Sequence, residues 1–373
     1  MTVHVDGRYV GQRRPLRILA QDEVERIHQA SLDVLADTGV MFHSQRALDV
    51  LEAHGASVDR ETTVARIPAA TVDEALKTLP VHFTLGGRTS EFDLPIDGEH
   101  AYLTSDGCAT FVREADGTVR PSVKQDVYEA ARVVDALPNL SATSALVSAQ
   151  DTPEESRVLH EFDACMRASR KHSIVVSIKD ATEAKPLVRM AEAVAGGAAE
   201  LKARPTFSII LCTVSPLHQE RFGMELAFEL ADAGIPMMLY PMPILGATAP
   251  VTPAGTAVVN NTEILAAITA VQLACPGARI IHAGGPTALF MRTGPTSPTS
   301  PRRCSCAPRK RRWRSSTACR QASAGAAPSP SSRRRSRPTR TRSAWCSSWP
   351  PARTSSSAPA SSTARSRCRS RSW

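Results

Sequence analysis

Six short apolar segments of the chain each end close to a side chain that could do chemistry. These side chains are Asp106, Gln150, Lys179, Ser215, Tyr240 and His282. A carboxylate or an imidazole can transfer protons, a lysine can form a Schiff base, and an aromatic ring can face a cation. Three of them also have a stated structural alternative: Asp106 precedes a glycine, as in a turn, Lys179 fits a solvated loop, and His282 fits an apolar core.

The elements that must position these side chains alternate in type. Amphipathic helical segments, among them 183–194, 220–233 and 262–273, separate strand candidates that recur about every 30 to 40 residues. This rhythm indicates a parallel sheet, and without a GxGxxG fingerprint it favours an α/β fold of the TIM-type (β/α)8 barrel class. The strand candidates are 101–104, 141–148, 173–178, 206–211, 236–240 and 279–282. Six βα units are two short of eight, so we predict an incomplete barrel.

Three regions follow from this pattern. Residues 1–90 are predicted to form an N-terminal helical region, because 24–35 and 47–51 show helical apolar spacing and Thr71 to Glu74 resembles a capping box. Residues 91–294 are predicted to form the partial barrel, and residues 295–373 a disordered tail rich in Arg, Ser and Pro. Because barrel sites lie at the carboxyl ends of the strands, we expect Asp106, Ser215, Tyr240 and His282 to open on one mouth.

The most distinctive local pattern is the loop GATAPVTPAG at residues 246–255. It leads into a helical segment that carries Asn260, Asn261 and Glu263. A helix N-terminus offers free backbone N–H groups, where an anion or the polar edge of a cofactor could dock.

Four cysteines, Cys108, Cys165, Cys212 and Cys275, are widely spaced in residues 1–294 and form no CxxC or metal-finger pattern. We therefore expect reduced thiols and no metal site. No run reaches the roughly 18 apolar residues that span a bilayer, and the N-terminus lacks the apolar region of a signal peptide. These observations predict a cytoplasmic protein.

The formal net charge of +9 hides two different parts. Residues 1–294 carry 26 basic and 36 acidic side chains, a net charge of −10, whereas residues 295–373 carry 19 basic side chains and no acidic one. The basic part contains no Leu, Ile, Val, Phe or Met, so it has no side chains with which to build a core.

Almost every residue of this tail has C or G at the second position of its codons, Lys310 and Gln321 being the exceptions. Such a restriction is typical of the wobble position of a GC-rich gene translated one base out of register. A frameshift near Gly294 is therefore our interpretation, and shifting residues 317–320 back permits Tyr-Gly-Leu-Pro. A natural Arg/Ser tail that binds RNA is the alternative.

Several blocks of the chain resemble the trimethylamine methyltransferase family. They are HQASLDVLADTGVMFHS at 28–44, RIPAATVDEAL at 66–76, the segment from GATAPVTPAG to RIIHAGG at 246–285, and MRTG at 291–294. The permitted Tyr-Gly-Leu-Pro is also a family phrase. The resemblance covers nearly all of residues 15–294.

The resemblance implies a TIM barrel that moves a methyl group from a methylated amine to the Co(I) centre of a corrinoid carried by a partner protein. Trimethylamine and quaternary amines such as glycine betaine are the implied substrates. Some members use a pyrrolysine, whose position falls in the part of the family pattern that this chain lacks. Because cobalt is the nucleophile, the chain needs none of its own, and it contains no DxHxxG corrinoid-ligating motif.

Site residues are assigned under this resemblance. Acid–base or charge-stabilising roles fall to Asp106, His282 and Glu263; substrate binding falls to Tyr240, Ser215, Gln150 and Phe290; contact with the cofactor falls to Gly246, Thr248, Thr252 and Asn261. The expected partners are a small methylated amine and the cognate corrinoid protein, without nucleic acid or membrane, and a homo-oligomer is left open.

Two other functions stay open. The Arg-rich tail could bind RNA or a membrane surface, although the charge of −10 on residues 1–294 opposes this. A Schiff-base aldolase using Lys179 is the third hypothesis, which borohydride trapping would test.

Overall fold

A computed structural model describes residues 3–5, 8–10, 19–98, 100, 102–176, 178, 181–289 and 296–297. All of these belong to one compact unit, Met1–Ala327. Lys179, Phe290 and the tail from residue 298 onward lie outside the described residues, and so do the predictions made for them.

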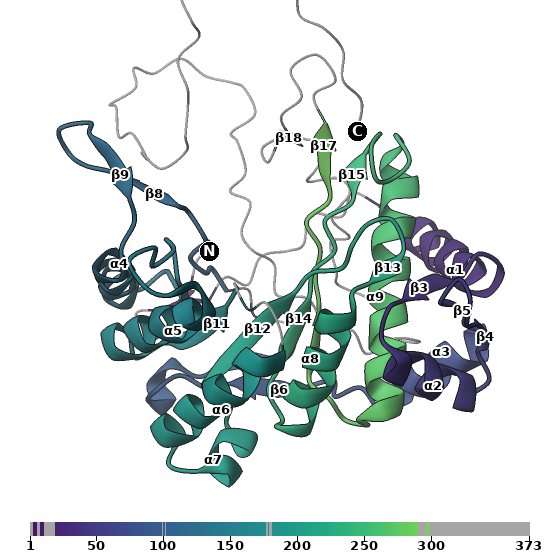
Figure 1. Ribbon diagram of the computed structural model, residues 1–373, viewed down its shortest axis with the longest axis horizontal. Coiled ribbons are helices and arrows are strands. Elements are labelled where there is room, and N and C mark those ends of the chain that lie inside the picture. The colour runs from purple at the N-terminus through teal and green to yellow at the C-terminus, as the bar shows by residue number, and fades with distance from the viewer. Residues whose placement is uncertain are drawn as a thin grey trace, which may run out of the picture. The chain divides into compact units, whose positions relative to one another are not determined.

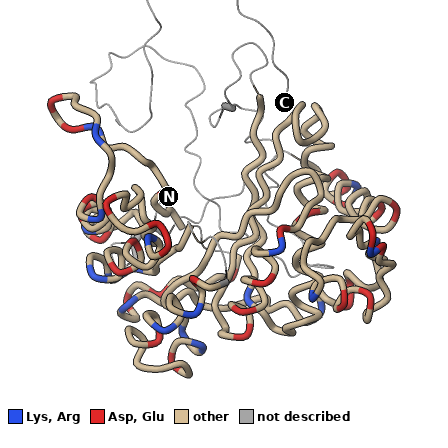
Figure 2. The backbone as a smooth tube through the Cα atoms, in the orientation of Figure 1, with Lys and Arg blue, Asp and Glu red and all other residues tan. Residues whose placement is uncertain are grey.

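The centre of the fold is a parallel sheet whose strands lie side by side in chain order (Figure 1). Doubly wound sheets reverse their strand order, whereas barrels do not, so this sheet is part of a TIM-type barrel. None of its strands contains Lys, Arg, Asp or Glu, and charged residues lie on the surrounding segments (Figure 2). The strands are β10 (Ala142–Ser144), β11 (His172–Val175), β12 (Phe207–Leu211), β14 (Met237–Leu239) and β16 (Ile280–His282).

The expected first strand, 101–104, is only partly formed. Thr104 makes a single parallel bridge to Ala142, and the segment then follows β10 as an irregular edge. The backbone N–H of Ser144 donates to the side-chain oxygen of Ser105 (2.9 Å), so a hydroxyl replaces a carbonyl in the ladder. Asp106 and Gly107 then turn the chain, which is why no regular strand extends here.

The helices that connect the strands cover one face of the sheet, which we call the outer face. Phe207, Ile209 and Met237 pack there with helix residues in the largest core. The opposite, inner face carries Ile174, Met238 and Ile281, and its core is completed by a hairpin of β6 (Phe83–Leu85) and β7 (Leu94–Ile96). The helices are α5 (Arg157–Ala168), α6 (Ala181–Ala195), α7 (Ala198–Ala203), α8 (Arg221–Asp232) and α9 (Pro253–Ala274).

The N-terminal region contains the expected helices and also strands that we did not predict. Helix α1 (Gln21–Asp37), α2 (Gln45–Ala53) and α3 (Ala69–Lys77) pack against α9. Between them lie β3 (Val40–Phe42), β4 (Ser57–Asp59) and β5 (Val64–Arg66), which form a sheet with β13 (His218–Gln219) from the barrel. The N-terminal region therefore combines helices with short strands, which the sequence did not reveal because strands of three residues are too short to show a period.

The capping box proposed at Thr71 is also corrected. Helix α3 already begins at Ala69 after Pro68, and the Thr71 hydroxyl donates to the carbonyl of His54 (2.9 Å). Thr71 thus joins α3 to the end of α2 instead of capping its own helix.

The remaining elements surround the barrel. Helix α4 (Lys124–Ala136) packs against α5 and follows a hairpin of β8 (Phe111–Arg113) and β9 (Val119–Pro121). The others are β1 (Val3–Val5), β2 (Arg8–Val10), β15 (Ile244–Leu245), β17 (Thr287–Leu289), β18 (Thr296–Ser297) and the 3-10 helices Ser90–Phe92 and Glu154–Ser156. Strand β18, which falls within the segment expected to be disordered, pairs with β17.

A buried histidine lies at the start of β11. The Nδ1–H of His172 donates to the carbonyl of Gly86 (2.9 Å), so Nε2 accepts from the hydroxyl of Ser208 (2.9 Å). Burial lowers the pKa of His172 to about 4. The folded protein therefore keeps this imidazole neutral under conditions in which the unfolded chain is protonated.

Stability should fall as the pH drops through this window. Below pH 6.5 the unfolded chain binds a proton that folded His172 does not, so the free energy of unfolding should decrease by up to about 3 kcal/mol towards pH 4. His172→Leu should flatten the pH dependence measured by urea unfolding, and the exposed His82→Leu should not. An unchanged slope in His172→Leu would assign the pH dependence to other groups.

Candidate functional site

The carboxylate of Glu263 is buried where α9 meets the loop that follows β12. Its Oε2 accepts hydrogen bonds from the hydroxyls of Thr213 and Ser215, and its Oε1 accepts from the N–H of Leu217 (2.9 Å). The side chain of Gln219 donates to the Glu263 carbonyl (2.8 Å). Burial raises the pKa of Glu263, and these donors oppose the rise. One carboxylate therefore fixes the whole connection between β12 and α8.

That connection has an unusual backbone. Leu217 has φ +60°, in the left-handed region that non-glycine residues rarely adopt, and the Ser215–Pro216 peptide bond is cis. The hydrogen bond from the N–H of Leu217 to Glu263 holds the residue in this conformation. Ser215 is thus a hydrogen-bond partner of Glu263.

His282 lies on the outer face of the sheet. It pairs with Leu239 in the ladder, and its Nε2 donates to Oδ1 of Asn261 on α9 (3.1 Å). Asn261 in turn donates to the hydroxyl of Ser31 on α1 (3.0 Å). The polar chain from His282 to Ser31 joins strand, helix and N-terminal region, which favours a structural role for both His282 and Asn261.

Tyr240 lies on the inner face, with Met238 and Ile281. Since side chains alternate along a strand and Leu239 is paired with His282, Tyr240 and His282 share the carboxyl end of the sheet but point to opposite sides. The structure therefore does not bring His282 into a common pocket with Tyr240. The tyrosine ring covers Gly285, where an added Cβ would lie 2.6 Å from the ring.

Asp106 is exposed beside the end of β10. Its carbonyl accepts from the hydroxyl of Ser144 (2.6 Å), and its Oδ1 accepts from the N–H of Gly107 (2.9 Å). The residue forms a turn, as its position before glycine indicated, and its carboxylate stands at the carboxyl end of the strands. Asp106 and Tyr240 thus both lie at the carboxyl end of the strands, and their sharing one site stays a prediction.

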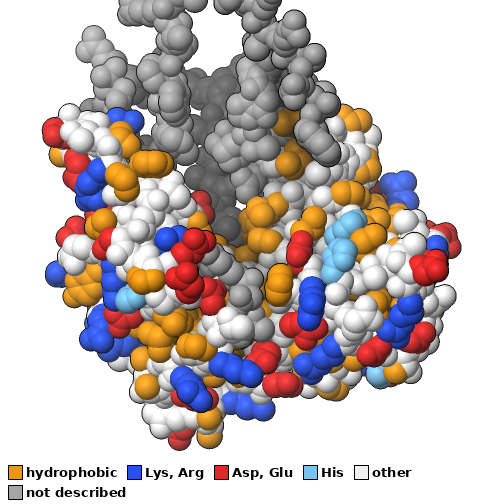
Figure 3. Space-filling model, in the orientation of Figure 1, with side chains coloured by type: hydrophobic (Ala, Val, Ile, Leu, Met, Phe, Trp, Pro, Cys, Tyr) orange, Lys and Arg blue, Asp and Glu red, His pale blue; other side chains and the backbone are white. Residues whose placement is uncertain are grey.

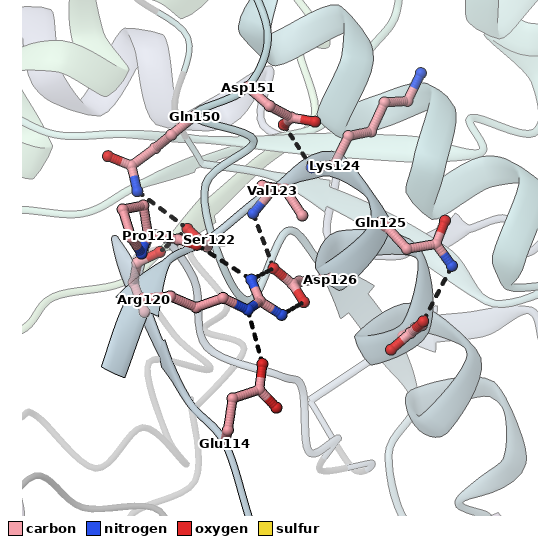
Figure 4. A network of polar contacts seen from close by, with 12 residues as sticks. Glu114, Arg120, Pro121, Ser122, Val123, Lys124, Gln125, Asp126, Gln150 and Asp151 are labelled. Atoms are coloured by element: carbon pink, nitrogen blue, oxygen red, sulfur yellow. Dashed lines mark hydrogen bonds and ion pairs between the residues drawn. The ribbon is translucent and has the colours of Figure 1, made fainter. Parts of the chain in front are cut away.

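Gln150 supports a neighbouring loop instead. Its side-chain amide donates to the carbonyl of Thr110 and lies 3.4 Å from the Ser122 hydroxyl (Figure 4). Nearby, Arg120 pairs with both Asp126 (2.7 Å) and Glu114 (2.7 Å). The Arg120 ion pairs anchor the base of the β8–β9 hairpin on α4, and Gln150 holds the adjoining Thr110 and Ser122; its assignment to substrate binding stays a prediction.

Polar side chains of the loop at 246–255 accept hydrogen bonds from backbone N–H groups in and next to the loop. Thr252 caps α9 by accepting from the N–H of Gly255 (3.2 Å), and Thr248 accepts from the N–H of Ile244 (2.9 Å). Gly246, at φ +78°, begins the tight turn. Because these side chains already satisfy backbone donors, the loop offers fewer free N–H groups to a cofactor than its sequence suggested.

Sequence reasoning missed the close contact between α9 and Gly284. The side chain of Asn260 is buried, and neither its Oδ1 nor its Nδ2 has a hydrogen-bond partner in the described part of the chain. An added Cβ at Gly284 would lie 2.4 Å from that Oδ1. The paired glycines of HAGG are therefore needed for close packing: Gly284 against Asn260 and Gly285 against Tyr240.

A parallel sheet in chain order, helices on its outer face and polar residues at its carboxyl end define an α/β-barrel enzyme class. The family model described as trimethylamine methyltransferase (MTTB) matches residues 4–306, so the chain belongs to this family.

Named relatives agree with this assignment. The chain is 32% identical over 274 residues to a protein named trimethylamine methyltransferase MttB from Desulfitobacterium hafniense strain DSM 10664 / DCB-2, covering 73% of this chain and 55% of that protein. It is 27% identical over 294 residues to a glycine betaine methyltransferase from Desulfitobacterium hafniense strain Y51, covering 78% and 61%. The chain thus spans little more than half the length of the curated relatives it matches.

Solved structures show a weaker likeness. The hydroxylamine complex of MtmB matches with a TM-score of 0.45 and 13% identity, covering 77% of this chain and 56% of that one. The Methanosarcina barkeri monomethylamine methyltransferase MtmB matches with a TM-score of 0.40 and 14% identity, covering 73% and 59%. At such values the fold rests on the sheet order described above.

Two further properties concern metal binding and membrane spanning. Among the described residues, no group of three or more His, Cys, Asp or Glu side chains could hold a metal ion. Of the described helices, α9 is long and apolar enough to cross a membrane, but 78% of its most apolar stretch is buried inside the protein. This burial is typical of a core helix.

Replacing Glu263 should loosen one defined loop. Glu263→Ala leaves three donors without their acceptor, so we expect a loss of about 2 to 4 kcal/mol in the free energy of unfolding and faster hydrogen exchange at Leu217. Because its folded pKa is raised, the carboxylate's contribution should decline as the pH rises above 4.5, and Glu263→Gln should remove that decline.

The matched control is Glu161→Ala. Glu161 is a buried carboxylate on α5 that accepts from Ser148 and Ala149 after β10. Glu161→Ala should lower the free energy of unfolding without changing hydrogen exchange at Leu217. Equal exchange at Leu217 in both variants would contradict the role given to Glu263.

Adding a methyl group at Gly284 should be destabilising. Gly284→Ala should cost about 1 to 3 kcal/mol in unfolding free energy, because the buried Asn260 amide must move. Asn260→Ala alone should be nearly neutral, and the double variant should recover most of the loss. Gly223→Ala is the control, since its Cβ would meet nothing closer than 3.8 Å. Additive effects in the double variant would show that the two residues are not coupled.

Proposed function

We propose that this chain carries the catalytic barrel of a methyltransferase that moves a methyl group from a methylated amine to the cobalt of a corrinoid on a partner protein. The observation that carries the proposal is the family match over residues 4–306. Trimethylamine and a quaternary amine such as glycine betaine are both candidate donors, because the named relatives include methyltransferases for each. We place the reaction in the cytoplasm.

The inner face at the carboxyl end of the sheet suits such a substrate. Tyr240 offers an aromatic ring to an alkylated ammonium group, and Asp106 adds a negative charge at the same edge. Leu146, Val214 and Met242 are exposed in the segments that follow β10, β12 and β14, where they could contact methyl groups. The net charge of −10 on residues 1–294 also favours a cationic ligand.

The corrinoid supplies the Co(I) electron pair that takes the methyl group, so the chain has to bind and orient the amine. The described residues build no obvious cradle for the corrinoid itself, since Thr248 and Thr252 are engaged within their own loop. This supports a carrier that presents its cofactor from outside. The contacts first assigned to Gly246, Thr248, Thr252 and Asn261 are therefore not used in the proposal.

The other hypotheses gain no support from the described residues. On the face shown in Figure 3, their Lys and Arg side chains are interspersed with Asp and Glu and form no large patch of one sign. An RNA- or membrane-binding role would depend on the tail, and an aldolase role on Lys179, both outside the described residues. A steep fall of RNA affinity with salt, or borohydride trapping at Lys179, would favour one of them.

Substrate binding should depend on Tyr240. We expect Tyr240→Ala to weaken the binding of trimethylammonium and of glycine betaine about 5- to 30-fold, equivalent to about 1 to 2 kcal/mol of cation–π energy. Tyr240→Phe should keep most of the affinity. Isothermal titration calorimetry would measure it, with Tyr128→Ala as control because Tyr128 packs in a separate cluster on α4. Equal weakening by Tyr128→Ala would remove Tyr240 from the site.

Transfer itself is followed by the absorbance change from Co(I) to methyl-Co(III), using the full chain, its frame-restored form and a corrinoid protein. We expect the frame-restored form to react and the chain as printed to react slowly or not at all, since positioning within a barrel tolerates errors of only about 0.5 Å. Failure of the restored form with trimethylamine, glycine betaine, proline betaine and carnitine would overturn the proposal.

A further inference from the structure

Two exposed cysteines lie near the carboxyl end of the sheet. Cys108 lies in the irregular edge segment beside β10, and Cys212 directly follows β12. They come from strands two positions apart in the sheet order, with β11 between them. Bringing them together therefore requires the edge segment to bend across β11.

The packing of Gly107 shows that bend. A Cβ added to Gly107 would lie 3.2 Å from the carbonyl oxygen of Ala145, beyond β10, and 3.3 Å from Cγ2 of Val176, beyond β11. Val176 packs on the inner face. The edge segment thus crosses both strand ends, and Cys108 is the next residue along it.

Cys108 itself has a strained backbone, with φ +70°. Non-glycine residues in the left-handed region persist only where the surroundings hold them. Here the N–H of Cys108 donates to the carbonyl of Ala145 (3.1 Å), which fixes the segment in its crossing position.

Cys212 completes the pair from the other side. It lies two residues after Ile210, whose side chain packs on the inner face, so strand alternation directs Cys212 to that face. Burial raises the pKa of Cys212, and the charge of Cys108 raises it further.

We propose that Cys108 and Cys212 form a reversible disulfide across the mouth of the sheet. The oxidant is a low-molecular-weight disulfide, RSSR. The Cys108 thiolate attacks one sulfur of RSSR and releases RS⁻, and the Cys212 thiolate then attacks the Cys108 sulfur of the mixed disulfide and releases the second RS⁻. Two protein thiols are oxidised, one RSSR is reduced to two RSH, and the thiol protons pass to the leaving groups.

The consequence is a redox-controlled tie between the edge segment and β12. Disulfides in reducing compartments are usually transient and regulatory, and this one would close over Val176 when the thiol pool is oxidised. The inference depends only on the positions of the two cysteines and does not use the methyl-transfer chemistry.

The test is thiol mapping of the full chain in glutathione buffers of increasing GSSG content. After alkylation, proteolysis and mass spectrometry, we expect a peptide pair linked through Cys108 and Cys212, formed faster at higher pH because thiolate is needed. Cys165, with a pKa raised to about 12, and Cys275, with a pKa raised to about 11, should stay alkylated and serve as internal controls.

Cys108→Ser and Cys212→Ser should each abolish the linked pair and leave a glutathione adduct on the remaining cysteine. The chain has five more cysteines, so the mapping is repeated in a variant with serine at all of them: Cys304, Cys306, Cys319, Cys346 and Cys368. Separate adducts on Cys108 and Cys212 without a link in that variant would overturn the proposal.

Discussion

The burial of the Glu263 carboxylate is the interaction on which the second half of the barrel depends. A carboxyl group in a core is costly unless donors occupy its oxygens, and here three donors from a single loop do so. The same helix, α9, packs against α1, α2, α3 and α8. The loop after β12 and the N-terminal region are therefore positioned by one element.

Helix α9 can position these parts of the chain because other helices pack against it on several sides. Four consecutive polar residues in the middle of it, Asn260 to Glu263, are all buried. At about 100° per residue they point in different directions, so Asn260 meets Gly284, Asn261 meets His282 and Ser31, and Glu263 meets the β12–α8 loop. A helix with one exposed side would show an amphipathic pattern, whereas α9 is largely apolar around its circumference, and Asn261 and Glu263 are buried where neighbouring elements supply hydrogen-bond partners.

The sequence was a good guide to the elements and a poor one to the faces of the sheet. Strands near 206–211 and 236–240 and helices near 183–194 and 220–233 were found because apolar periodicity is a local property. Whether Tyr240 and His282 share a face depends on the register Leu239 with His282, which joins residues far apart in the chain. Which residues line the inner face could be learned only from the packing in the structure.

Hydrogen bonds within a loop also limited how well the site could be predicted from the sequence. Ser, Thr and Asn near a helix start can bind a ligand or satisfy the backbone themselves, and the two outcomes have the same sequence. Thr252 and Thr248 accept hydrogen bonds from nearby backbone N–H groups, and Gln150 likewise donates to the carbonyl of Thr110. The role of Gly284 depends on a contact with Asn260 that no spacing rule anticipates.

The pairing of β3 with β13 has a consequence for synthesis of the chain. Met41 lies opposite His218, about 180 residues later. At roughly 5 to 20 residues per second, the ribosome delivers the partner strand about 10 to 35 seconds after β3 has emerged. During that interval the β13 side of β3 is an unpaired edge, open to other extended segments. The nascent N-terminal region therefore reaches its final sheet only after β10, β11 and β12 have been made.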